Sequence, residues 1–256
     1  MFYYKKFNIN HFEEVDSTNI KAIEIARSKF DSNYSIVIAD KQSAGKGRLN
    51  RAWESPRGNL YFSLILQNST LDKLFLEKIN QIGMLSILAM QQAIIELATN
   101  YNLASKNILI KWPNDLLING KKFSGMLMES EINQDICKFL VIGIGINVNS
   151  YPSHIKRLNF PATDLFSENI ILDKMDILYK FLDKFDSFLT NFLQFGFENI
   201  RKLWLKNSFQ LNQEITIKIN DDNIINGIFS DIDDNGNILL LSNGVINKIS
   251  YGDIGF

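Results

Sequence analysis

The hydrophobic pattern of this chain changes its spacing several times, which predicts helices alternating with strands. Apolar positions recur at helical spacing in some segments and form short β-branched runs typical of strands in others. The order of these elements predicts an α+β fold built on a mixed sheet. The predicted helices cover residues 18–29 and 74–100 and a stretch that begins at Asp173; the predicted strands lie near residues 35–42, 59–67, 107–130 and 137–148.

The helix expected from Asp173 carries its aromatic residues on one face. Asp173 is a good N-cap residue, and Gly196 marks the end of the helix before another one that finishes near Asn207. An aromatic stripe at helical spacing is typical of core packing and is rarely a cofactor site. We therefore expect the stripe to be buried. It comprises Phe181, Phe185, Phe188 and Phe192.

A tight hairpin is predicted around Asn119-Gly120, the dipeptide most typical of a two-residue β-turn. The apolar run before it ends at Ile118, and the strand after it starts at Lys121. In that register Asp115 and Lys122 are diagonal neighbours on one face of the ribbon, roughly 7 Å apart. The same pair in an ordinary hairpin would be a cross-strand ion pair without a chemical role.

The pattern of apolar and polar residues changes beyond Phe209. Short alternating strands follow one another there, separated by turn signals such as Asn243-Gly244. This pattern predicts a small β-domain at 209–256, after a larger domain at 1–208. The expected strands contain Ile215, Ile217 and Ile219, then residues 224–229, 238–241 and 245–249.

The loop at residues 43–53, which follows a predicted strand, is a candidate anion-binding site. Two glycines are expected to adopt positive φ and to let the main chain approach a ligand, while basic side chains supply donors for phosphate or carboxylate oxygens. Trp53 adds an apolar surface. Such loops also occur as ordinary surface turns. The glycines are Gly45 and Gly47, and the basic residues are Lys46, Arg48 and Arg51.

Composition narrows the class of protein. The chain has 256 residues, 46% of them apolar, with 27 Lys and Arg against 28 Asp and Glu, so no overall field favours nucleic acid or an anionic membrane. The apolar helix near residues 82–97 contains Gln91 and Glu96, which indicates a core helix. A single cysteine, Cys137, and no cleavable signal peptide favour a reducing cytoplasm. Two histidines make a His/Cys metal site improbable.

Five motifs resemble the biotin protein ligase family over nearly the whole chain, and they follow one another along the chain in the family's order. Besides the loop with Gly45-Lys46-Gly47-Arg48, they are the Lys-Trp-Pro-Asn-Asp block at 111–115, the Lys-x-x-Gly block at 122–125, Asp16-Ser17-Thr18-Asn19, and the Gly-rich strand at 143–149. Each motif alone is weak. The resemblance implies the class II aminoacyl-tRNA synthetase-like fold of biotin and lipoate ligases, closed by an SH3-like barrel.

The resemblance also implies a two-step reaction. The carboxylate of biotin attacks the α-phosphate of ATP, which releases pyrophosphate and leaves biotinyl-5′-AMP; a lysine of a biotin carboxyl carrier protein or domain then takes the biotinyl group and releases AMP. ATP, with its Mg²⁺, and biotin are the implied small molecules. An acetyl-CoA carboxylase or related carboxylase is the implied partner, and both monomers and homodimers occur in the family.

Site roles follow from the resemblance residue by residue. Lys122, Asp115 and Arg48 are the expected catalytic residues, with Lys122 between the carboxylate and the phosphate and Asp115 receiving a proton from the carrier lysine. Lys46 stands where many members have arginine. Biotin is expected to contact Ser17, Thr18, Asn19, Gln42, Lys46, Gly47, Arg48 and Lys122; ATP and the adenylate are expected to contact Arg51, Trp53, Lys111, Asn114 and Asn147.

Plainer interpretations stand beside several of these roles. Ser17 is a good helix N-cap, and we expect it both to cap and to bind; Gln42 could end a solvated strand. Gly143 and Gly145 fit tight sheet packing as well as ligand approach. Trp112-Pro113 is expected to fix the backbone before Asn114.

Two other functions compete with the biotin ligase hypothesis. A lipoate or octanoate ligase shares the chemistry, but such relatives show a different Arg-rich, triple-glycine segment. A sensor that binds biotin or nucleotide without turnover would keep the pocket and lose the rate. Some family members also carry an amino-terminal winged helix; because the first motif begins at Asp16, we expect none here and no specific DNA binding.

Overall fold

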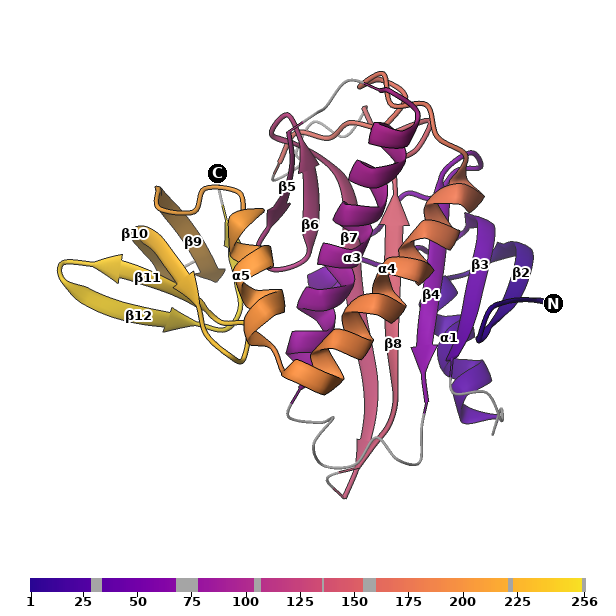
Figure 1. Cartoon of the computed structure of the whole chain (residues 1–256), viewed down its shortest axis with the longest axis horizontal. Helices are drawn as coiled ribbons and strands as arrows, with labels where there is room; N and C mark the ends of the chain where they lie inside the picture. The colour runs from indigo at the N-terminus through magenta and orange to yellow at the C-terminus, as the bar shows by residue number, and fades with distance from the viewer. Residues whose placement is uncertain are drawn as a thin grey trace. The chain divides into compact units, whose positions relative to one another are not determined.

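The computed structural model describes residues 1–28, 34–67, 78–103, 107–134, 136–153, 160–220 and 223–254 (Figure 1). Its chain forms two compact units, which are taken in turn. Unit 1 comprises Met1–Ile79, Phe123–Pro152 and Thr163–Tyr179; unit 2 comprises Asn80–Lys122, Ser153–Ala162 and Lys180–Phe256.

Unit 1 is built on a mixed sheet. Its strands lie in the order β1-β2-β3-β4-β8-β7, and only β2 and β3 run parallel. Helix α1 (Thr18–Arg27) packs on β3, β4 and β8. The mixed sheet and the α+β class confirm the prediction. The strands are β1 (Phe2–Tyr4), β2 (Phe7–Val15), β3 (Tyr34–Gln42), β4 (Leu60–Leu66), β7 (Lys121–Asn133), whose first two residues belong to unit 2, and β8 (Ile136–Ile146).

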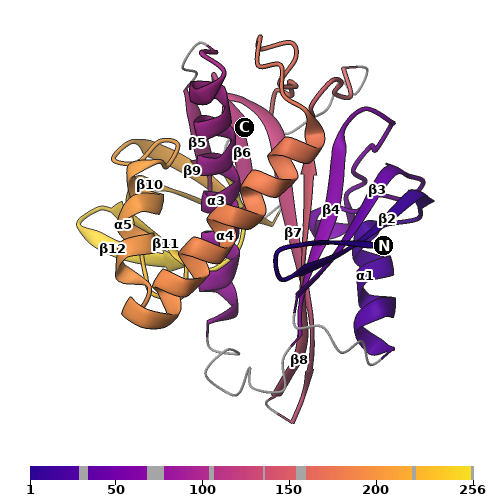
Figure 2. The same ribbon diagram turned by 45° about the vertical axis from the view of Figure 1, so that its right-hand side comes forward.

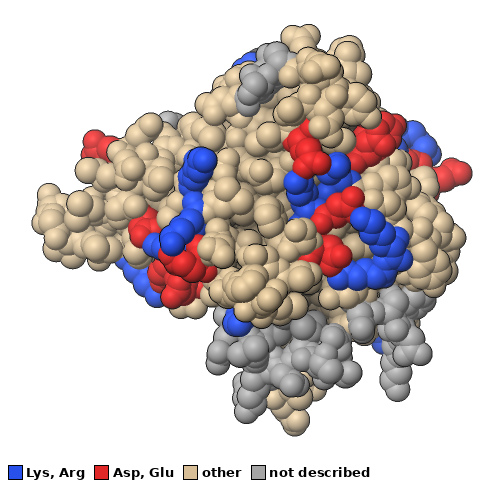
Figure 3. Space-filling view, in the orientation of Figure 1, with Lys and Arg blue, Asp and Glu red and all other residues tan. Residues whose placement is uncertain are grey.

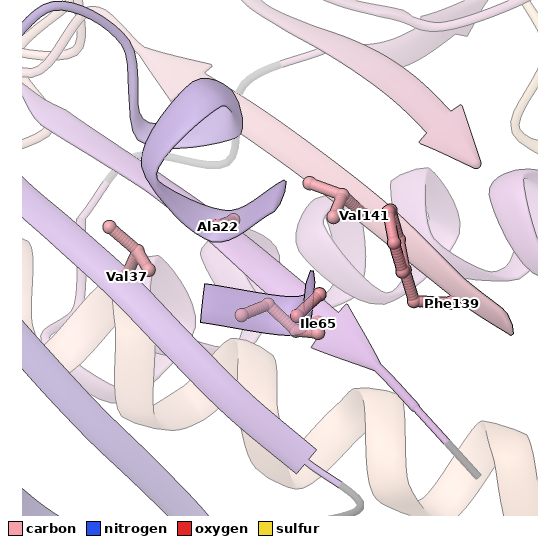
Figure 4. Packing of buried hydrophobic residues seen from close by; sticks show 6 residues of the cluster. Ala22, Val37, Ile65, Phe139 and Val141 are labelled. Atoms are coloured by element: carbon pink, nitrogen blue, oxygen red, sulfur yellow. The ribbon is translucent and has the colours of Figure 1, made fainter. Parts of the chain in front are cut away.

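The core of unit 1 lies between α1 and the sheet. Figure 4 shows Ala22 of α1 near Val37, Ile65 and Val141, which come from three different strands. All of them are at most 1% exposed. Burying a side chain of valine or isoleucine size contributes about 1.5–3 kcal/mol, so this cluster fixes where α1 lies on the strands.

Strands β1 and β2 were not predicted. They pair antiparallel from Phe2↔Ile9 to Tyr4↔Phe7. Asn8 is fully buried in β2, and such a polar residue at an inward position conceals the hydrophobic alternation that a strand prediction relies on.

Unit 2 contains nearly all of a long apolar helix and a second sheet. Helix α3 (Ile79–Asn100) is the one described helix long and apolar enough to cross a membrane, and 78% of its apolar window is buried inside the protein, as in a core helix. Helix α4 (Lys174–Phe195) belongs to unit 2 from Lys180 onward, where it runs beside α3 in both views (Figures 1 and 2), and its Lys180 and Lys184 pair with Glu96 of α3. Strands β5 (Ile108–Lys111) and β6 (Asp115–Ile118) pair antiparallel, and α5 (Glu198–Lys206) follows α4.

The carboxyl-terminal strands form an antiparallel sheet of five, in the order β12-β11-β10-β9-β13. Alternate residues point inward, among them Ile217, Phe229 and Leu240, each fully buried. The division at 208/209 stays a prediction. The strands are β9 (Glu214–Asn220), β10 (Asn223–Ile232), β11 (Ile238–Ser242), β12 (Val245–Ile249) and β13 (Asp253–Ile254).

Several local signals are confirmed. Asn119 and Gly120 have φ of 50° and 76°, as the predicted two-residue turn requires. Asp173 Oδ1 accepts from the backbone N–H of Met175 at 2.7 Å, which makes Asp173 the N-cap of α4. Gly196 ends α4 with φ of 79°. Residues 74–77, the first part of the helix predicted at 74–100, lie outside the described residues.

Candidate functional site

Ser17 stands at the N-cap position of α1 but does not cap it. Its backbone is extended, with φ −152° and ψ 136°, and its side chain makes no capping hydrogen bond, so this part of the prediction is wrong. Gln42 reaches over from β3 instead, and its Oε1 accepts from the N–H of Thr18, the first helical residue, at 2.8 Å. The Ser17 hydroxyl is therefore left without a capping role, in a residue that is only 3% exposed.

The amide of Gln42 has a fixed orientation. Its oxygen faces the N–H of Thr18, and its nitrogen donates to Ser55 Oγ at 2.7 Å. Ser55 Oγ in turn donates to the carbonyl oxygen of Trp53 at 2.8 Å. These contacts tie the end of β3 to the start of α1, so Gln42 is not the solvated strand end that its position alone allowed.

Asn19 occupies a buried position above three neighbouring strands. Its Nδ2 donates to Glu129 Oε2 at 2.7 Å and to the carbonyl oxygen of Leu127 at 3.3 Å. Its Oδ1 lies 2.6 Å from Ser63 Oγ. Ser63 Oγ also lies 2.8 Å from Thr18 Oγ1. Thr18, Asn19 and Ser63 are at most 4% exposed.

Gly143 provides the space for Asn19. Ser63 of β4 and Leu127 of β7 both pair with Gly143 of β8, so the three residues form one row across the sheet. A Cβ at Gly143 would lie 2.0 Å from Asn19 Oδ1. Only glycine is compatible with the observed position of Asn19.

The basic loop after Gln42 is held by its own backbone. Gly47 N–H donates to Arg51 O at 2.7 Å, and Trp53 N–H donates to Gly45 O at 2.9 Å. The predicted positive φ at Gly45 and Gly47 is wrong, because the loop reverses at Leu49 and Asn50, with φ of 54° and 57°. Gly45 is required for another reason: a Cβ there would lie 2.3 Å from the carbonyl oxygen of Trp53.

The three cationic residues of this loop differ in exposure. Lys46 and Arg51 are exposed, and Arg48 is half-buried. Arg51 Nε donates to the carbonyl oxygen of Arg48 at 3.1 Å. The loop thus presents several cationic donors on a folded turn.

Trp53 leads from this loop to the Gly-rich strand. A Cβ at Gly145 would lie 2.5 Å from Trp53 Nε1, so the indole rests directly on this part of β8. Asn147 follows one residue after β8 and is 4% exposed. Its Nδ2 donates to Thr163 O at 3.1 Å, which leaves the second amide hydrogen and the side-chain oxygen for other contacts.

The predicted pair in unit 2 forms. Lys122 Nζ lies 2.7 Å from Asp115 Oδ1, and the two side chains are 28% and 14% exposed. Lys122 N–H also donates to Pro161 O at 2.7 Å, which fixes the start of β7. The ammonium is therefore half-open to solvent and held by a carboxylate on a rigid ribbon.

Lys111 and Trp112 of the 111–115 block are held by contacts with residues distant in the sequence. Lys111 is 6% exposed, and its Nζ lies 5.0 Å from the centre of the Phe160 ring, a cation–π contact. Trp112 is 2% exposed and donates from Nε1 to Gly236 O at 3.0 Å. The structural interpretation of Trp112 therefore holds. Asn114, two residues further on, is half-buried.

Sequence reasoning missed three residues of the polar network, Ser55, Ser63 and Glu129. Ser63 is a hydroxyl residue in the middle of the otherwise apolar strand Leu60–Leu66, and this contrast is the signal that could have found it. Glu129 gave no such signal, because a carboxylate near the end of a long strand is ordinary.

Charge on the face in Figure 3 is mixed in sign. Lys and Arg lie next to Asp and Glu there, and no broad area of one charge covers this face. Among the residues that the structure describes, no three or more His, Cys, Asp or Glu are grouped so that they could hold a metal ion.

Comparisons with known proteins identify similar proteins for both the amino-terminal and the carboxyl-terminal part of this chain. The model of the biotin/lipoate A/B protein ligase family matches residues 12–147, and that of the biotin protein ligase C terminal domain matches residues 211–256. The bifunctional ligase/repressor BirA of Bacillus subtilis is 33% identical over 95% of this chain and 72% of its own length. The biotin–[acetyl-CoA-carboxylase] ligase of Paracoccus denitrificans is 30% identical over 88% of this chain and 90% of its own.

A solved structure shows the same architecture. The biotin protein ligase from Aquifex aeolicus, in complex with biotin and ATP, is 27% identical, with a TM-score of 0.75 over 97% of each chain.

Proposed function

This chain belongs to the biotin/lipoate A/B protein ligase family, and we propose for its residues the parts they play in a biotin protein ligase. The enzyme activates biotin with ATP and transfers it to a lysine of a biotin carboxyl carrier protein or domain. The observation that carries this function is the similarity, across both matched regions, to relatives named for biotin ligation.

The first step joins two anions. A carboxylate oxygen of biotin attacks the α-phosphorus of ATP, the bond from that phosphorus to the bridging oxygen breaks, and pyrophosphate leaves. Negative charge increases around the phosphorus, so fixed cations stabilise the transition state. We assign this role to Lys122, with Lys111 and Arg48 as further cations, and Mg²⁺ enters bound to ATP.

Recognition of biotin falls to the residues around the start of α1. The ureido ring offers two N–H donors and one carbonyl acceptor, which require hydroxyl and amide partners. Ser17, Thr18 and Gln42 supply them, and Asn19 holds Thr18 in place through Ser63. Lys46, Gly47 and Arg48 contact the valeryl tail and its carboxylate.

The adenylate is held by a second group of residues. The Trp53 indole offers a flat apolar surface for the adenine ring, and Arg51 supplies a cation for the phosphate. Asn114 and Asn147 offer amide groups to the adenosine. The basic loop at 43–53 shields the reactive anhydride from water.

The second step needs a neutral amine. The carrier lysine attacks the biotinyl carbonyl carbon, an amide bond forms, and AMP leaves with the electrons of the broken anhydride bond. Asp115 accepts the proton that the amine loses. Its ion pair with Lys122 separates when Lys122 turns to the phosphate, which frees the carboxylate for that proton.

The rest of the assignment covers the setting of the enzyme. We propose that the five-stranded carboxyl-terminal sheet is an SH3-like barrel at 209–256. The enzyme works in the cytoplasm on a carrier domain of acetyl-CoA carboxylase or a related carboxylase. We further propose that it binds neither DNA nor membrane.

The test measures pyrophosphate release from ATP with biotin or lipoate as the acid. We expect release with biotin, and then biotin bound covalently to an added carrier domain, detected with labelled streptavidin. Release that depends on lipoate alone would refute the assignment. Tight biotin binding without pyrophosphate release would identify a sensor.

A further inference from the structure

We infer that Glu129, Asn19 and Ser63 are positioning residues that make the Thr18 hydroxyl a pure hydrogen-bond acceptor toward the ligand. The inference rests on the proposed binding of biotin near Thr18. It concerns the direction of each hydrogen bond in the buried network, which follows from counting hydrogens.

The direction starts at Glu129. An ionised carboxylate has no hydrogen to donate, so the contact of 2.7 Å between Glu129 Oε2 and Asn19 Nδ2 must use an amide hydrogen. The carbonyl oxygen of Leu127, 3.3 Å away, takes the other one. Two acceptors on the same side therefore fix the amide of Asn19 with its nitrogen toward β7 and its oxygen toward Ser63.

The next link uses the only hydrogen of Ser63. Asn19 Oδ1 is an acceptor, and Ser63 Oγ is 2.6 Å from it, so Ser63 donates its hydroxyl hydrogen there. The contact of 2.8 Å between Ser63 Oγ and Thr18 Oγ1 must then use the hydrogen of Thr18. Thr18 is left with lone pairs and no free hydrogen.

Burial makes this arrangement difficult to reverse. Ser63 is fully buried and Asn19 and Thr18 are nearly so, and a donor turned toward another donor at such a place loses its hydrogen bond without gaining one from water. Gly143 leaves the space that the amide of Asn19 occupies, because any side chain there would overlap its oxygen.

The consequence is a rule for the ligand. A group that faces Thr18 must donate a hydrogen, as a ureido N–H does and as a ring oxygen or carbonyl does not. A site that depends on a fixed acceptor rejects a ligand lacking the donor, because two lone pairs then face each other without a hydrogen.

The experiment compares biotin with two cyclic carbamate analogues, each with an oxygen in place of one ureido N–H. Dissociation constants are measured by calorimetry for the wild-type chain and for Ser63→Ala. We expect the wild-type chain to bind one carbamate about 100-fold more weakly than biotin. In Ser63→Ala the Thr18 hydrogen is released and can donate to the ring oxygen, so this ratio falls to about 10 or less.

Three further variants separate hydrogen-bond direction from charge and from packing. Glu129→Leu removes the carboxylate acceptor and lowers the ratio in the same way, while Glu129→Gln still offers an oxygen to Asn19 and keeps it. Ser55→Ala, in the neighbouring Gln42 network, weakens all three ligands by one common factor. Because each variant is compared with itself across ligands, loss of folded protein cancels out of the ratio.

Two outcomes would overturn the inference while the proposed function stands. In the first, the wild-type chain binds biotin and binds both carbamates as tightly as biotin. In the second, Ser63→Ala leaves unchanged the ratio of the carbamate and biotin dissociation constants. A wild-type chain that binds no biotin would overturn the proposed function and this inference with it.

Discussion

Two polar groups of this protein differ in almost every physical respect. Thr18, Ser63 and Asn19 are buried in unit 1 and connect to the half-buried Glu129, and each hydrogen in this network has one destination. The pair of Lys122 and Asp115 in unit 2 is ionic and half-open to solvent. Buried hydroxyl and amide groups that a carboxylate orients fix the direction of hydrogen bonds and thereby select a ligand, whereas an ion pair near solvent can separate and take part in a reaction.

The largest effect should come from the ionic pair. Lys122→Ala removes the cation assigned to the phosphate, and we expect adenylate formation to slow by about 10²–10³-fold while the dissociation constant of biotin changes much less. Pyrophosphate release in a single turnover measures the rate. Lys121→Ala, the exposed neighbour, is the matched control. Adenylate formation at the wild-type rate in Lys122→Ala would remove Lys122 from the mechanism.

The carboxylate of the same pair should act one step later. Asp115→Asn keeps the size of the side chain but cannot accept a proton, so transfer of biotin from preformed adenylate to the carrier lysine should slow by about 10²-fold. Raising the pH supplies more neutral amine and should restore part of the rate. Equal slowing of both steps, with no effect of pH on transfer, would show that Asp115 only positions Lys122.

The buried network should respond to shape. Gly143→Ala places a Cβ 2.0 Å from Asn19 Oδ1, and such overpacking costs about 1–3 kcal/mol, or roughly 5–150-fold in biotin affinity if it falls on the bound state. Gly145→Ala meets Trp53 instead and should raise the KM for ATP more than that for biotin. If the two variants have the same profile, biotin and ATP recognition are not divided between Asn19 and Trp53 as proposed.

The smallest effect should come from an ion pair without a chemical role. The hydrogen bonds from Lys180 and Lys184 lower the pKa of Glu96 to about 2. Because the folded pKa lies below the unfolded value, the stabilisation is complete above about pH 4.5 and is lost as pH falls toward 2. The side chain is 37% exposed, so solvent screening limits the contribution to less than about 1 kcal/mol.

Urea unfolding at several pH values measures this contribution. The stability difference between wild type and Glu96→Gln should be present at pH 6 and shrink toward pH 3. In a background of Lys180→Met and Lys184→Met it should be absent. A difference that stays constant down to pH 3 would contradict the assigned pKa.

The two regions also differ in how far the sequence predicted them. Asn119-Gly120 acts through its own backbone, so the hairpin and the nearness of Lys122 to Asp115 followed from local rules. The partners of Asn19 come from strands 44 and 110 residues away, and only the packing of α1 on the sheet brings them together. The positive φ expected at Gly45 is wrong. Glycine is needed there because a side chain would overlap the carbonyl oxygen of Trp53, a contact that local rules could not reveal.

One pair of variants tests the division between selection and chemistry most directly. For Ser63→Ala and Lys122→Ala, the dissociation constant of biotin and the rate of adenylate formation at saturating biotin and ATP are measured separately. We predict that Ser63→Ala weakens binding about 10-fold and leaves the saturated rate within about 2-fold, while Lys122→Ala loses the rate. A saturated rate that falls by the same large factor in both variants would contradict the account.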